Sequence, residues 1–222
     1  MSYEREFFFE TVRGSPFGGS LTQRQVDGMN YLLSVWEDKF EENAGDQSTP
    51  WLAYCLATTF HETAQKMVPI EEYGEGSGHV YGKPTGPYEQ CYYGRGHVQL
   101  TWLENYQKAQ GILSDKYDYY APLVQYPHRM LEDTPSALVL FDGMITGWFT
   151  GNGLPQFFNE NEEDPIGART VVNGHDKDVI IADYYWSFKA ALKPVTLIEV
   201  EVVTRPRRRG VGSHSPLQGL RK

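Results

Sequence analysis

The sequence predicts a mostly helical domain with a small irregular or β-containing lobe around residues 70–100, a mainly α (α+β) fold class. Capping residues precede several apolar stretches of helical spacing, at Thr22, Thr49, Thr134 and Asp164. Between Tyr73 and Tyr93 the chain is instead rich in Gly, Pro and Tyr with little periodicity, as in a long loop or short strands. The 222 residues, 40% of them hydrophobic, suffice to bury a full core.

The first two predicted helices follow threonine caps. Thr22 and Gln25 have the spacing of a capping box. One apolar face follows, formed by Val26, Met29, Leu32, Leu33 and Trp36. Thr49 precedes Pro50, which suits the first position of a helix that runs on toward His61 and Glu62.

Three more helices are predicted in the second half of the chain. Thr134 with Pro135 precedes the apolar residues 136–149, and Asp164 with Pro165 precedes residues 166–174, where Gly174 marks a helix stop. Residues 178–192 form the last helical stretch. We therefore expect one catalytic domain over residues 1–192. Residues 193–222 follow as a strand-like segment and a basic, disordered tail.

Charge and composition exclude several classes of partner. A formal net charge of −9 disfavours nucleic acid, because phosphate binding needs a basic face. The chain has no run of about eighteen apolar residues that would predict a membrane span, and its N-terminus lacks the pattern of a signal peptide, so we expect a cytoplasmic product. We also expect a monomer. The two cysteines, Cys55 and Cys91, are expected to be reduced.

Three carboxylates around a helix end suggest acid and base chemistry. Glu62 lies near the end of the second helix, which Pro69 must stop, and Glu71 and Glu72 follow directly. An inverting glycosidase needs two carboxyl groups roughly 6.5 to 9.5 Å apart, one as acid and one as base for a water. Three solvated surface carboxylates are the alternative interpretation.

Other chemistries find less support. Gln65 and Lys66 stand where a second zinc-binding histidine would follow His61. The segment "YGRG", residues 93–96, lacks the Lys and Ser or Thr of a phosphate loop, and no nucleophilic triad has a local signature. Two carboxyls and a water need no metal or organic cofactor, and none is expected.

The ordered motifs resemble glycoside hydrolase family 19, which holds chitinases and many phage endolysins within the lysozyme-like superfamily. The motifs are "HET" at 61–63, a Glu nine or ten residues later, "YYGRGHVQLTWLENY" at 92–106 and "ARTVVNG" at 168–174. The match runs over about residues 20–192. It implies a two-lobed helical, lysozyme-like fold with a central cleft and hydrolysis of a β-1,4 linkage beside N-acetylglucosamine.

The resemblance assigns Glu62 as the general acid and either Glu71 or Glu72 as the base. Thr101 would help to hold the attacking water, although its spacing to Glu104 also suits a helix cap. The residues expected to contact sugar are His61, Tyr93, Gln99, Trp102, Asn105 and Asn173. Tyr92 would join Tyr93 and Trp102 in the cleft wall.

Two departures from the family pattern concern arginine and cysteine. Arg95 and Arg169 are candidates to hold a carboxylate, but the arginine that plant members carry after the "NG" motif has no clear counterpart, and their disulfide-forming cysteines are absent.

The sequence therefore predicts an endolysin-like hydrolase that cuts peptidoglycan and acts on the cell wall after release from a phage-bearing or prophage-bearing bacterium. A chitinase and an inactive sugar-binding module remain open alternatives. Two interpretations of the basic tail stay open: it binds anionic wall polymers or membranes, or it only adds solubility; stable membrane insertion is not expected.

Overall fold

The computed structural model describes residues 2–195. Its helices are α1 Arg5–Gly14, α2 Gln23–Lys39, α3 Glu41–Ala44, α4 Ser48–Glu62, α5 Leu103–Tyr117, α6 Asp133–Thr146 and α7 Asp178–Ala191. Short 3-10 turns are η1 Gly45–Gln47, η2 Val80–Gly82, η3 Pro127–Leu131, η4 Leu154–Gln156 and η5 Gly167–Val171. The strands are β1 Ile70–Glu71 and β2 Arg95–Gly96. Most of the predicted C-terminal strand and all of the basic tail lie outside the described residues.

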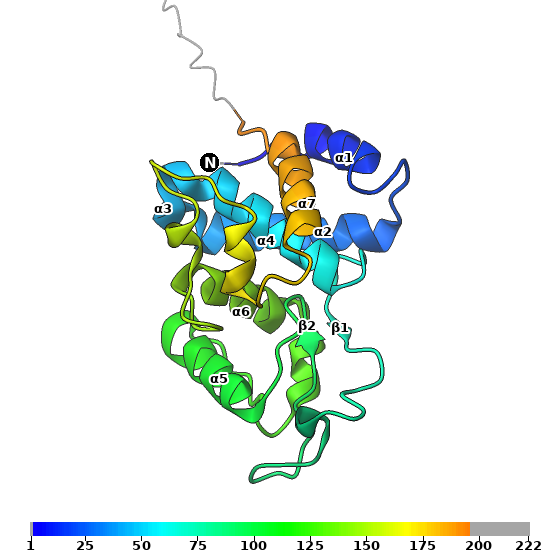
Figure 1. Cartoon of the computed structure of the whole chain (residues 1–222), viewed down its shortest axis with the longest axis vertical. Helices are drawn as coiled ribbons and strands as arrows, with labels where there is room; N and C mark the ends of the chain where they lie inside the picture. The colour runs from blue at the N-terminus through cyan, green and yellow to red at the C-terminus, as the bar shows by residue number, and fades with distance from the viewer. Residues whose placement is uncertain (1, 196–222) are drawn as a thin grey trace, which may run out of the picture.

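The molecule has two parts along its long axis. Figure 1 shows α1, α2, α3, α4 and α7 at one end and α5 with the segment after β1 at the other, with α6 and the strands between them. We call α1–α4, α6 and α7 the helical body, and residues 70–102 the polar lobe. Both the predicted helical class and the small lobe are confirmed.

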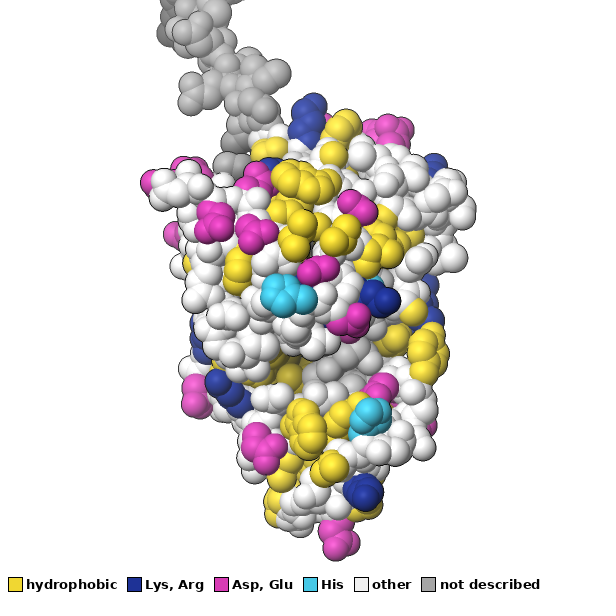
Figure 2. Space-filling view, in the orientation of Figure 1, with side chains coloured by type: hydrophobic (Ala, Val, Ile, Leu, Met, Phe, Trp, Pro, Cys, Tyr) yellow, Lys and Arg dark blue, Asp and Glu magenta, His cyan; other side chains and the backbone are white. Residues whose placement is uncertain are grey.

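Helix α4 is the centre of the helical body. It packs against α7, α6 and α3, and every residue from Trp51 to Phe60 is buried. Apolar residues therefore surround the whole helix, unlike the one-sided face of α2. Helix α7 covers α4 and in turn packs against α1. Figure 2 shows apolar side chains gathered over α7. The exposed large apolar residues of this helix are Val179, Ile180 and Trp186.

The capping predictions had mixed outcomes. At α2 the box is formed, because Thr22 accepts from the Gln25 backbone and the Gln25 side chain accepts from the Thr22 backbone. The predicted cap at Thr49 is wrong, since α4 begins one residue before it after Gln47. The predicted cap at Thr134 is wrong as well, since α6 begins at Asp133 and the Thr134 hydroxyl bonds the Tyr31 hydroxyl at 2.6 Å.

Two further helix starts differ from expectation. Asp164 accepts from the Gly167 backbone at 2.8 Å, but it is not the cap residue: the turn that follows, η5, is 3-10 and not α, and its cap position is Ile166. Thr101 does not cap α5, because the cap position is Trp102, whose φ of 73° turns the chain instead. The last helix, α7, is confirmed. Helix α1 was not predicted; it packs on α7 through the buried Phe8 and Val12.

The chain turns sharply between Glu62 and Pro69. Helix α4 ends at Glu62, earlier than Pro69 requires, because Ala64, Gln65 and Met67 all have positive φ. The Gln65 amide donates to the Phe60 carbonyl at 2.7 Å, as in a Schellman-type helix end. Gly28 of α2 makes room for this turn, since a Cβ there would lie 2.1 Å from the Met67 carbonyl oxygen.

The polar lobe is joined to the helical body by a buried histidine. β1 and β2 are antiparallel, with Ile70 opposite Gly96 and Glu71 opposite Arg95. Directly after β2, the His97 backbone N–H donates to the Ser136 hydroxyl of α6 at 2.8 Å, and Nδ1 of the same ring lies 2.8 Å from that oxygen. Burial lowers the pKa of His97 to about 3, so this joint is neutral.

Two smaller expectations can be placed on the described residues. Cys55 and Cys91 are free thiols, as expected. Within residues 2–195, no helix is both long and apolar enough to cross a membrane.

Candidate active site

A cleft of about 760 Å³ lies between the helical body and the polar lobe. It is lined by the end of α4, by β1 and the loop after it, by the loop between β2 and α5, and by the segment after η5. All but one of the predicted site residues line it: His61, Glu62, Glu71, Glu72, Gln99, Thr101, Trp102, Asn105 and Asn173. The fold thus brings together residues that are 112 positions apart in sequence, from 61 to 173.

Glu62 is held by a buried arginine. It is the last residue of α4, and its Oε1 accepts from Arg169 Nη1 at 2.9 Å. The Arg169 side chain is only 3% exposed, and its Nε donates to the Asp176 carbonyl at 2.9 Å. Among residues 2–195, only Oε1 of Glu62 has such a partner, so one oxygen is anchored and the other is available to the cleft.

Glu71 is held in a similar way from the polar lobe. Its Oε1 accepts from the Tyr93 hydroxyl at 2.9 Å and from Arg95 Nε at 3.3 Å. Arg95 is 5% exposed, lies 3.5 Å from the Tyr93 ring centroid and donates to the Tyr106 hydroxyl at 3.2 Å. Burial and the bond to Glu71 raise the pKa of Tyr93, so its hydroxyl remains a donor.

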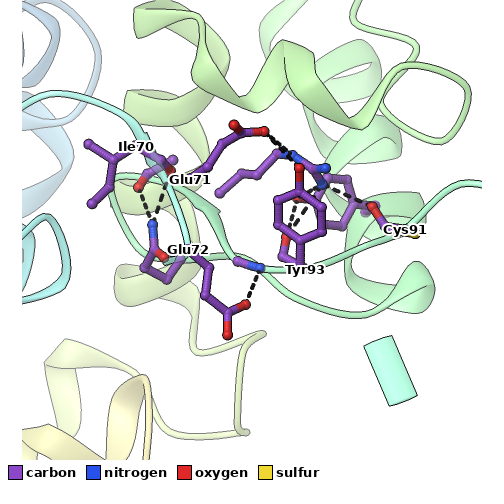
Figure 3. Close-up of polar contacts among 10 residues, drawn as sticks. Ile70, Glu71, Glu72, Cys91 and Tyr93 are labelled. Atoms are coloured by element: carbon purple, nitrogen blue, oxygen red, sulfur yellow. Dashed lines mark hydrogen bonds and ion pairs between the residues drawn. The ribbon is translucent and has the colours of Figure 1, made fainter. Parts of the chain in front are cut away.

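Glu72 has both carboxylate oxygens engaged by the lobe itself. Oε1 accepts from the Tyr81 hydroxyl at 3.1 Å, and Oε2 accepts from the Gly94 backbone at 3.0 Å. Figure 3 shows the carboxyl groups of Glu71 and Glu72 on opposite sides of the chain, as the alternation of an extended strand requires. Glu72 therefore ties the long loop to β2, while Glu71 keeps one oxygen without such a partner among the described residues.

Two amide side chains in the cleft, Gln99 and Asn105, donate their N–H groups to backbone carbonyls of the protein. Gln99 Nε2 donates to the Ile70 and Gly96 carbonyls, both at 3.1 Å, and Asn105 Nδ2 donates to the Thr101 carbonyl at 2.9 Å. Their carbonyl oxygens remain as acceptors for a ligand. Gln99 and Trp102 have positive φ, and such backbone strain is concentrated at functional sites.

His61 faces the cleft in its neutral form at neutral pH. Burial lowers its pKa, against the opposing effect of the neighbouring Glu62 carboxylate. A neutral imidazole can both donate and accept a hydrogen bond, which suits a sugar hydroxyl. Asn173 lies exposed at the far side, where its Oδ1 accepts from the Gly174 backbone at 2.9 Å.

Tyr93 and Tyr92 do not form the cleft wall that the sequence predicted. Tyr93 is only 8% exposed, because Arg95 covers its ring, and its hydroxyl bonds Glu71 and does not face the cleft as a wall. Tyr92 is fully buried, and its hydroxyl donates to the Val124 carbonyl at 2.7 Å. Sequence reasoning instead missed Tyr73, Tyr81 and Phe149, which line the cleft. Tyr73 and Tyr81 lie in the irregular segment, where no periodicity tells inward from outward side chains.

The acidic residues of the cleft are matched to arginine and tyrosine donors. Among residues 2–195, no three His, Cys, Asp or Glu side chains are grouped as metal ligands. Glu62 and Glu71 instead each contact one buried guanidinium, from Arg169 and Arg95.

Comparisons with known proteins relate the chain to chitinases by structure. No protein-family model and no curated protein sequence matches it. Chitinase C from Streptomyces griseus is 20% identical with a TM-score of 0.55, over 85% of this chain and 76% of that chain. A chitinase C mutant is 16% identical (TM-score 0.49, 85% and 91% covered), and a bacterial family 19 chitinase is 19% identical (0.49, 85% and 94%). The likeness to the first of these confirms the predicted lysozyme-like helical fold.

Proposed function

We propose that this protein is a glycoside hydrolase that cleaves β-1,4 linkages next to N-acetylglucosamine, with Glu62 as general acid and Glu71 as general base. The observation that carries the proposal is the pair of carboxylates on one cleft, each with one oxygen fixed by a buried arginine. Two such groups supply the proton for the leaving oxygen and the acceptor for the proton of an attacking water.

The exposure of the two side chains supports this division of roles. The Glu62 side chain is 17% exposed, whereas that of Glu71 is 39% exposed. A proton donor must face the leaving oxygen of a bound glycan, which suits the more sheltered carboxyl, whereas a base must meet water. Arg169 and Arg95 then set the direction in which each free oxygen points. Thr101, on the same cleft, offers a hydroxyl to hold the water.

Glu71 is the better base of the two open candidates. Its second oxygen can accept the proton of a water without losing a contact. Both oxygens of Glu72 are already engaged, by the Tyr81 hydroxyl and the Gly94 amide, so a water would have to share an oxygen that holds the lobe together. We therefore assign Glu72 to holding the polar lobe in shape.

Bacterial peptidoglycan is the substrate we place first, because the motif pattern resembles that of phage endolysins as well as chitinases. Chitin is the second candidate, and the likeness of the fold to a chitinase C favours it. Both polymers present N-acetylglucosamine in β-1,4 linkage, so the same two carboxylates would serve either.

The test is reducing-sugar release from purified peptidoglycan and from chitin oligomers, with wild type, Glu62→Gln, Glu71→Gln and Glu72→Gln. We expect Glu62→Gln and Glu71→Gln to lose activity by about a thousandfold while remaining folded. Glu72→Gln should keep more than about a tenth of it, because only lobe contacts change. A wild type that binds oligomers without cleaving either polymer would mean a sugar-binding module. Activity lost in Glu72→Gln and kept in Glu71→Gln would exchange their roles.

A further inference from the structure

We propose that Phe149 is a rigid platform for the apolar face of a pyranose ring in the cleft, a substrate-binding residue that the sequence did not indicate. Phe149 lines the same cleft as Glu62 and Glu71, and its side chain is partly exposed. The proposal rests on the proposed function only in that the ligand is a glycan.

The ring of Phe149 is seated on a glycine of α6. A Cβ added to Gly143 would lie 2.1 Å from Cζ of Phe149 and 2.4 Å from Cε2, so the ring occupies the space that any side chain at 143 would take. Trp148 packs against the same ring, with centroids 4.3 Å apart at an angle of 56°. The ring therefore has a fixed position in the absence of ligand.

The residue before Phe149 is tied to a buried carboxylate. Trp148 Nε1 donates to Oδ1 of Asp142 at 3.2 Å, and Asp142 is 3% exposed. Oδ2 of the same residue accepts from the Tyr117 hydroxyl at 2.7 Å and pairs with Lys116, both of α5. Lys108 adds a cation 5.4 Å from the Trp148 ring centroid. The Trp148 indole is thus anchored to α5 and α6 together.

The residue after Phe149 is tied to the opposite wall. The Thr150 hydroxyl lies 2.7 Å from the Thr170 carbonyl and 3.1 Å from the Val171 carbonyl, at the end of η5. Val172 and Asn173, which follow directly, also line the cleft. Both neighbours of Phe149 are therefore restrained, one to α6 and one to η5.

A preorganised aromatic ring suits a sugar better than a mobile one. The flat apolar face of an aromatic side chain packs on a flat apolar ligand face, and a side chain already fixed loses little entropy on binding. The polar groups of the cleft can bond hydroxyl and N-acetyl groups, while Phe149 contributes an apolar surface from the helical body. This division is typical of ligand sites that combine apolar walls with a few placed polar groups.

The first experiment measures binding of an N-acetylglucosamine hexamer by calorimetry in a Glu62→Gln background, where turnover does not interfere. We expect Phe149→Tyr to bind within about twofold of the parent, since it keeps the flat face. Phe149→Leu keeps apolar volume but not the flat face, and should bind about tenfold more weakly. Tyr120→Leu, an 81% exposed tyrosine that is not among the cleft residues, is the matched control and should change nothing.

A double-mutant cycle tests the seat of the ring. Gly143→Ala should displace the ring without removing it and weaken binding, and adding it to Phe149→Ala should cause no further loss. Fully additive losses would mean that Gly143 acts on the fold and not through the ring.

The outcomes separate this proposal from the catalytic one. Equal binding by Phe149→Leu and its parent would overturn the platform, even if wild type cleaves glycan. A wild type without activity whose hexamer binding still depends on the ring would support the platform and refute the hydrolase. No hexamer binding by any variant would overturn the platform as well.

Discussion

The helical body and the polar lobe each contribute one candidate catalytic carboxylate, but they are stabilised in different ways. Around α4, the stabilisation comes from buried apolar side chains, which lie between Trp51 and Phe60. In the polar lobe the strands are two residues long, and side-chain hydrogen bonds replace a sheet: Glu71 with Tyr93, Glu72 with Tyr81, and Gln99 with two backbone carbonyls.

The difference teaches how a small domain can place two acidic groups with unlike surroundings on one cleft. Burial of apolar surface is strong but not directional, so it fixes the position of α4 without fixing the Glu62 side chain. A guanidinium supplies the direction. In the lobe, directional bonds fix both the backbone and Glu71, and the same network determines the local shape.

The largest effect should come from the apolar side of this comparison. Phe60 of α4 is 1% exposed and packs its ring on Phe17, Tyr184 and Phe188. Phe60→Ala should lower the free energy of unfolding by about 4 kcal/mol, measured by chemical denaturation. Tyr73→Ala in the polar lobe, at a residue 72% exposed, is the control and should stay within about 0.5 kcal/mol. Equal losses of unfolding free energy in the two variants would show that apolar burial stabilises the polar lobe as much as the helical body.

The second effect concerns the guanidinium that directs Glu62. Arg169→Gln leaves a sheltered carboxylate without its partner and should cost about 3 kcal/mol in unfolding free energy. Arg5→Gln is the matched control, because Arg5 pairs with Glu37 at 2.7 Å but is 31% exposed, and should cost below about 1 kcal/mol. If Arg169→Gln were as mild as the control, the acid would not depend on this arginine for its place.

The third effect tests the neutral joint between the two parts. In the folded chain the pKa of His97 is about 3, against an ordinary 6.5, so the unfolded chain binds the extra proton between these values. As the pH is lowered below 6.5, the free energy of unfolding should therefore decrease, by up to roughly 1.4 kcal/mol per pH unit from this residue alone.

His97→Asn removes the titrating ring while keeping an acceptor toward Ser136, and it should flatten this fall in denaturation curves recorded from pH 7 to pH 4. Ser136→Ala should lower stability but keep the slope, because the imidazole stays buried. An unchanged slope in His97→Asn would assign the acid sensitivity to other groups.

The smallest effect lies in the support of Glu71. The Tyr106 hydroxyl accepts from Arg95 and donates to the Tyr93 carbonyl at 3.0 Å, so it reaches Glu71 only through other residues. Tyr106→Phe should cost about 1 kcal/mol of stability. It should also reduce the rate of glycan cleavage severalfold with KM unchanged, since Arg95 loses one of its fixed bonds. A loss as large as that of Glu71→Gln would indicate that Tyr106 has a more direct role.

The sequence predicted helices well where local chemistry alone decides them. The capping box of Thr22 and Gln25 needs no distant partner, and it forms as expected. At Thr134 the hydroxyl serves the distant Tyr31 instead, and at α4 Ser48 accepts a bond from Trp36, so the helix starts move. Sequence spacing cannot reveal such tertiary partners.

The sequence predicted most residues of the site, but it did not predict which side chains line the cleft and which lie behind them. Nine of the residues expected from the ordered motifs line the cleft. The two neighbouring tyrosines were placed on the wrong side, because Arg95 covers Tyr93 and Val124 takes the hydroxyl of Tyr92. Phe149 gave no signal, since in sequence it reads as the end of an apolar helix, whereas α6 stops at Thr146 and the loop turns the ring into the cleft.

The two ends of the described residues pair with each other on the helical body. Tyr3 is bridged to Pro194, and the Val195 amide donates to the Ser2 carbonyl at 2.7 Å. In Figure 1 this seam lies at one end of the molecule, with β1 and β2 well away from it. In a chain shortened to residues 2–195, a short linker could therefore join the ends, and new ends could be opened at the exposed residues Glu160 to Glu162. Such a circular permutant would leave the cleft intact, and a reporter fused at the seam would stand clear of a bound polymer.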